Sequence, residues 1–182
     1  MIDAAAATRR WIEQFVVGEN LCPFAAPVLR DELLRVAVCD STDELAQMRT
    51  LLHELDRLQS TPEEELATTV VVFTAALQDF DDYLDFLAVA EHLLDEAGLD
   101  GVIQIASFHP DYCFEGVAAT DVSNYTNRSP YPMLHLLRED MLTRVLRNYS
   151  EPEAIPQRNM ERMRELGAAH IGRLLAQIRN GH

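Results

Sequence analysis

The chain contains no lysine, since all 15 of its basic residues are arginine. Lysine supplies the amine of Schiff-base intermediates, so its absence excludes that chemistry for the side chains of this chain. Glycine is scarce, at seven residues in 182, and no Gly-rich phosphate-binding loop occurs. The G-x-S-x-G, HExxH and CxxC signatures are also missing. We therefore do not expect a dinucleotide-binding enzyme of the usual kind.

Cysteine and long apolar segments are also few. The three cysteines, Cys22, Cys39 and Cys113, are odd in number and widely spaced, which does not fit a disulfide framework. No stretch approaches the ~20 apolar residues that a membrane-spanning helix requires, and no secretory leader pattern is visible. From these features we expect a cytoplasmic protein with reduced thiols.

The sequence is rich in acid, with 30 acidic residues and a formal net charge of −15. Residues 40–100 hold 16 of these acids but only two bases, Arg49 and Arg57. Such an excess repels phosphate backbones and anionic lipids, so we expect no binding to nucleic acid or membranes. It remains compatible with a docking surface for a basic protein partner.

Apolar patterning alternates between strands and helices through the first hundred residues. Strands are expected at 33–39, 68–77 and 102–108, and helices at 3–17, 42–58 and 79–97. This alternation predicts an α/β fold with three to four mostly parallel strands flanked by helices. A ferredoxin-like α+β fold is the alternative, because a short strand could lie between residues 115 and 122.

The rest of the chain predicts a long loop followed by C-terminal helices. Residues 109–129 show little periodicity, and a loop of that length is often functional. Residues 131–147 are expected to form a helix, with Ser129 as N-cap and Pro130 at its first position. After a Pro-containing linker, residues 157–178 form an amphipathic helix. We expect 1–150 to be one α/β domain, with 151–182 packed on it.

A first candidate site combines His109, Asp111 and Cys113. In an extended chain these alternate residues point to one face, just past the carboxyl end of a predicted strand, where ligands often bind. With a fourth ligand such as His135, they could hold a divalent metal, zinc or iron. The alternative is a structural histidine that is hydrogen-bonded near a turn.

A second candidate site is an anion-binding helix start at Asn127, Arg128 and Ser129. The first turn of a helix leaves backbone N–H groups free at its positive end. Arg128 beside it could grip a carboxylate or phosphate with two hydrogen bonds. Ordinary capping beside an exposed arginine is the alternative.

A third group lies on the predicted helix that follows. His135, Arg138 and Glu139 would share one helical face, so that Glu139 could orient His135 as a general base. Cys22 and Cys113 are each candidate nucleophiles for pairing with a histidine. The alternatives are an exposed polar stripe and a buried free cysteine.

Several of these segments together resemble a bacterial family catalogued as domain of unknown function 1415. The residues that carry the resemblance are Trp11, 20–24 (NLCPF), 107–110 (SFHP), 127–132 (NRSPYP) and 135–139 (HLLRE). The similarity spans roughly residues 7–147. It implies that the segments around Cys22, around His109 and at 127–139 are motif positions of the family, and it implies no activity.

Two functions of different classes follow. The first is an enzyme acting on a small anionic substrate, in which His109 and His135 transfer protons while Arg128, Arg138 and Ser129 hold the anion. This enzyme would work either with or without a metal near His109 and Cys113. The second is a non-catalytic acidic adaptor that binds a basic protein partner through residues 40–100. The substrate and the oligomeric state stay open.

Overall fold

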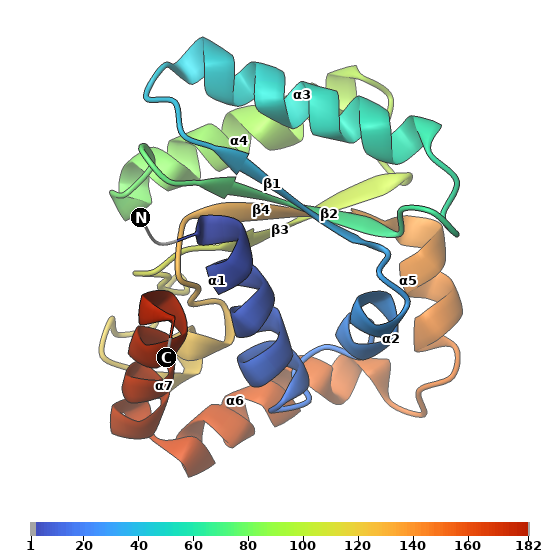
Figure 1. Ribbon diagram of the computed structural model, residues 1–182. Helices are drawn as coiled ribbons and strands as arrows, with labels where there is room; N and C mark the ends of the chain where they lie inside the picture. Colours follow the sequence, from blue (N-terminus) through green and yellow to red (C-terminus); the bar gives the residue numbers. More distant parts are fainter. Residues whose placement is uncertain (1–2, 182) are drawn as a thin grey trace.

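The computed structural model describes residues 3–181 and is built around one four-stranded sheet (Figure 1). Its strands are β1 Leu34–Cys39, β2 Thr68–Phe73, β3 Ile103–Phe108 and β4 Met133–Arg138. The order across the sheet is β1-β2-β4-β3. β2 is central, and all its residues are buried, which explains its nearly continuous β-branched sequence.

The α/β class is confirmed, but the expectation of a mostly parallel sheet is wrong. β1 and β2 are parallel, whereas β4 pairs antiparallel with both β2 and β3. The three expected strands do run in one direction, because β4 is inserted between β2 and β3. The short strand suggested between residues 115 and 122 does not form.

The inserted strand was predicted as the start of a helix over residues 131–147. Only its second half is helical, as α5 Glu139–Leu146. Leucine favours helices in isolation, but β4 makes backbone hydrogen bonds on both sides, and such pairing overrides local propensity. Pro132 disfavours the helical conformation at Tyr131, and Ser129 Oγ donates to the Tyr131 carbonyl (2.7 Å) rather than capping a helix.

Helices cover both faces of the sheet (Figure 1). One face carries α3 Glu44–Ser60 and α4 Phe80–Glu96, whose N-caps are Asp43 and Asp79. The other face carries α1 Ala4–Trp11, α2 Ala25–Arg30, α5, α6 Ile155–Leu166 and α7 Ala168–Asn180. Alternate residues of the strands therefore pack into two separate hydrophobic cores, one on each face of the sheet. Within residues 3–181, no helix has both the length and the apolar character needed to cross a bilayer.

Two of the expected helices have a different form. The N-terminal helix continues beyond α1 as a π-helical segment, η1 Ile12–Val17, which widens the backbone beside the sheet. The expected helix at 157–178 is two helices, because Gly167 adopts φ 75° between α6 and α7. Met163, Ile171 and Ile178 from these helices are buried in the same core as η1.

Candidate functional site

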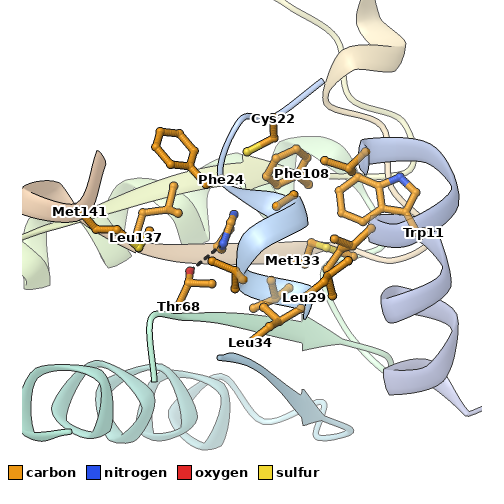
Figure 2. A pocket seen from close by; sticks show the side chains of 16 residues that line it. Trp11, Cys22, Phe24, Leu29, Leu34, Thr68, Phe108, Met133, Leu137 and Met141 are labelled. Carbon is orange, nitrogen blue, oxygen red and sulfur yellow. Dashed lines mark hydrogen bonds between the residues drawn. The ribbon is translucent and has the colours of Figure 1, made fainter. Parts of the chain in front are cut away.

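An apolar cavity of about 70 Å³ lies between the sheet and the segment formed by α1, η1 and α2 (Figure 2). Its lining residues are Trp11, Ile12, Val16, Cys22, Phe24, Ala25, Val28, Leu29, Leu34, Thr68, Val70, Phe108, Met133, His135, Leu137 and Met141. The sheet side is mostly buried, whereas Cys22, Phe24, Ala25 and Leu29 are only half-buried. The cavity therefore opens toward residues 22–29.

The cavity is uncharged. Among its lining residues, no side chain is an arginine or a carboxylate. Trp11 and Phe108 meet edge to face, with ring centroids 5.3 Å apart. In Figure 2, the six-membered ring of Trp11 lies toward Phe108 and the indole nitrogen points away. The polar side-chain atoms available to a ligand in the cavity belong to His135, Thr68 and Cys22.

The tautomer of His135 follows from its hydrogen bonds. The Thr68 hydroxyl donates its one proton to the Leu136 carbonyl (2.6 Å). The same oxygen lies 2.7 Å from His135 Nε2 and must accept there, so Nε2 carries the ring proton. Nδ1 therefore carries no proton and can only accept a hydrogen bond. Within residues 3–181 it has no hydrogen-bond partner, and it is not among the fully buried unpaired atoms. Nδ1 therefore keeps some accessible surface on a residue that lines the cavity.

Burial sets the protonation states of the two titratable groups here. Loss of hydration lowers the pKa of His135 to about 4, so the ring is neutral at physiological pH. Burial raises the pKa of the Cys22 thiol, an effect partly offset by the backbone N–H groups of Phe24 and Ala25. The resting cavity therefore holds a thiol and a neutral imidazole.

His109 lies elsewhere and is fully buried. Its Nε2–H donates to the Leu77 carbonyl (3.0 Å), and its Nδ1 accepts from the Asp111 backbone N–H (3.0 Å). The ring packs against Phe80 and Tyr83, with centroids 5.1 Å from each, and burial lowers its pKa. Both nitrogens are in use, so the contacts of His109 fit the alternative of a structural histidine.

The proposed metal ligands do not gather in this geometry. Asp111 is exposed, and Cys113 Sγ donates to the Val117 carbonyl (3.2 Å). Within residues 3–181, no three His, Cys, Asp or Glu side chains lie where they could share a metal ion. The geometry therefore gives no support to a metal centre at His109, Asp111 and Cys113.

Arg128 and Asn127, which were proposed for the helix-start anion site, instead donate hydrogen bonds to backbone carbonyls. Arg128 donates from Nε to the Tyr112 carbonyl (3.1 Å) and from Nη2 to the Ala119 carbonyl (2.8 Å), and it stacks on Tyr125. Asn127 Nδ2 donates to the Ser107 carbonyl (3.0 Å). No helix begins at Ser129, so the helix start predicted there is wrong, and no helix dipole supports an anion site at this position.

The predicted grouping of His135, Arg138 and Glu139 on one helical face is also wrong, because His135 and Arg138 lie on a strand. Residues three apart on a strand point to opposite faces. Arg138 Nη2 therefore reaches the carbonyls of Leu58, Thr61 and Leu66, away from the cavity. Glu139 begins α5 and does not line the cavity, so it cannot orient His135 there.

A family model matches residues 3–173, and its description is "Protein of unknown function (DUF1415)". The chain belongs to the DUF1415 family. The resemblance drawn from the sequence is therefore confirmed. No curated protein and no solved structure matches the chain.

The cavity contains several residues of the segments that carried the resemblance to DUF1415. Trp11, Cys22, Phe24, Phe108 and His135 all line it. Sequence reasoning missed Thr68, Met133 and Met141. Thr68 left a weak signal, as a polar residue opening an apolar strand, whereas the methionines resembled any core residues.

Proposed function

We propose that the protein is an enzyme that takes a small, uncharged, mainly apolar substrate into this cavity, with His135 as hydrogen-bond acceptor and general base. The observation that carries the proposal is the free Nδ1 of His135, held in a fixed tautomer and facing an apolar space. A base must offer its lone pair to the substrate. Thr68 ensures that the nitrogen facing the cavity is the unprotonated one.

The lining favours a neutral substrate over an anionic one. A buried charge without a partner is costly, and neither Arg128 nor Arg138 lines the cavity. Nδ1 accepts a hydrogen bond, so the substrate should present an O–H or N–H group to it. The pKa of about 4 keeps His135 neutral and able to accept throughout the physiological range.

Binding of propan-2-ol and acetone tests the proposal, because these molecules differ little in shape but only the alcohol donates. One hydrogen bond contributes about 1 kcal/mol, so propan-2-ol should bind about fivefold more tightly than acetone. The readout is the NMR signal of ¹³C-labelled methionine methyls. Met133 and Met141 line the cavity and should shift, whereas Met48 and Met163 do not line it and should stay.

Two neighbouring alanines provide a matched control. Ala25→Leu should fill the cavity mouth and abolish binding, whereas Ala26→Leu adds the same side chain at an exposed position outside the lining. Equal binding of both probes, or shifts that survive Ala25→Leu, would contradict the proposal.

A second candidate function, docking of a basic protein segment, is supported by a groove between α3 and α4. The groove has a volume of about 420 Å³, and Glu44, Asp82 and Asp85 line it beside Phe86 and Val89. Exposed apolar side chains cluster on the same two helices, namely Leu45, Leu52, Leu84 and Val89. Within residues 3–181, no acid of α4 forms a salt bridge. The chemistry suits a segment that combines arginine or lysine with aliphatic residues.

A synthetic peptide of leucine and arginine pairs tests this second function. Two surface charges contribute about 1 kcal/mol together, so Asp82→Asn with Asp85→Asn should weaken binding about fivefold and flatten its salt dependence. Glu151→Gln with Glu153→Gln removes the same charge from exposed residues elsewhere. If both double variants lose affinity equally, the groove is not the docking site.

A further inference from the structure

Cys22 differs from the other two cysteines in its surroundings. Cys39 is buried with its sulfur 3.7 Å from the Thr50 hydroxyl oxygen, and Cys113 donates to the Val117 carbonyl. Cys22 is half-buried at the mouth of the cavity. In Figure 2 its sulfur lies between the rings of Phe24 and Phe108, across the cavity from Thr68.

The cavity also contains a base that could remove the proton of the Cys22 thiol. The thiolate is the nucleophile, and burial raises the pKa of Cys22, so a base must remove its proton during the reaction. His135 offers the unpaired Nδ1 to the same cavity, and Thr68 orients the ring through Nε2. A nucleophile, a base and a group that orients the base are the usual components of covalent catalysis. The N–H groups of Phe24 and Ala25 would stabilise the developing thiolate.

We propose that Cys22 is the nucleophile of this cavity and adds to a small α,β-unsaturated carbonyl compound, with His135 as the base. The inference rests on the proposed function and names its substrate class. The cavity of about 70 Å³ admits only a small molecule, and its uncharged lining selects a neutral one. Addition releases no leaving group, so no fragment has to leave the narrow space.

The step balances without an oxidant or a further reactant. As the sulfur forms a bond to the β-carbon of the substrate, the Cys22 S–H proton moves to His135 Nδ1 in the same step, because the raised pKa of the thiol and the lowered pKa of the imidazole disfavour a free ion pair. The C=C π electrons move toward the carbonyl to give an enolate. Nδ1 then returns the proton to the α-carbon. The product is a neutral thioether on Cys22, and the imidazole is neutral again. The reverse elimination, in which Nδ1 takes a proton from the α-carbon and the C–S bond breaks as the sulfur regains its proton, releases the compound and restores the thiol.

Methyl vinyl ketone is the probe, applied to the full chain at pH 7 with peptide mass spectrometry to follow each cysteine. Cys113 is an internal control, because it is also half-buried but lies outside the cavity. We expect Cys22 to react at least tenfold faster than Cys113. His135→Gln should slow Cys22 about 100-fold, in the range of general-base catalysis, and leave Cys113 unchanged. Thr68→Val, which removes the partner of Nε2, should slow Cys22 by a smaller factor.

A measurement on the unaltered protein covers the case in which the variants do not fold. Propan-2-ol should protect Cys22 from the ketone and leave Cys113 unprotected. If Cys22 reacts no faster than Cys113, or if the alcohol does not protect it, the inference is wrong. The binding experiment with methionine methyls reports separately on the cavity, so it distinguishes failure of the nucleophile from failure of the proposed function.

Discussion

The free energy of unfolding should fall by about 3 kcal/mol more in the wild type than in His135→Leu as the pH is lowered from 7 to 4. In the unfolded chain a histidine takes up a proton near pH 6.5, whereas burial holds the pKa of folded His135 at about 4. Between these values the unfolded state binds more protons, so lowering the pH favours unfolding. The gap between 6.5 and about 4 corresponds to about 3 kcal/mol.

Urea unfolding at pH 7, 6, 5 and 4 measures the effect. Full stability is present above pH 6.5 and is lost as the pH falls toward 4. His109 also has a lowered pKa, so part of the pH dependence should remain in His135→Leu. If the free energy of unfolding fell equally with pH in the wild type and in His135→Leu, His135 would be solvated and the cavity would not hold it neutral.

Replacement of Arg138 by methionine should destabilise the protein by about 3–5 kcal/mol. Nη2 of Arg138 lies 2.5, 2.6 and 3.0 Å from the carbonyl oxygens of Leu58, Thr61 and Leu66. These carbonyls belong to the end of α3 and the turn that leads into β2, and Leu58 and Leu66 are buried. Each unsatisfied buried acceptor costs about 1–3 kcal/mol. Methionine preserves most of the apolar stem but donates nothing.

Two further variants distinguish this structural role from the anion-binding role expected from the sequence. Arg138→Lys keeps one cationic donor group and should lose about half as much stability as the methionine variant. Arg128→Met should lose about 1–2 kcal/mol, because Arg128 donates to only two carbonyls and one of those bonds is exposed. Urea unfolding gives all three values. A stable Arg138→Met protein would show that these carbonyl contacts do not matter.

Three of the four strands, β1, β2 and β3, could be predicted from local sequence. The β-branched run at β2 indicates burial on both faces, and the apolar periodicity of residues 42–58 and 79–97 indicates the helices α3 and α4. β4 could not be predicted in this way. Its leucine-rich sequence after Ser129 and Pro130 has the local features of a helix start, and only pairing with β2 and β3 makes it a strand.

The candidate site shows the same division. Cys22 and His135 were recognisable singly, through chemistry and the family resemblance, but they are far apart in the sequence. Whether His135 or Arg138 lines the cavity with Cys22 depends on which face of β4 each residue occupies. Once residues 133–138 form β4, His135 points into the cavity with Met133 and Leu137, and Arg138 points to the other side.

The sequence by itself determined the family, the α/β class, the acidic charge and the absence of lysine chemistry, because composition, caps and local periodicity are properties of short segments. The tertiary structure alone decided the relative directions of the strands, the separation of His109 from His135 and the placement of Cys22 and His135 on the lining of one cavity. Those outcomes depend on backbone pairing and packing between distant segments, which local propensity does not encode.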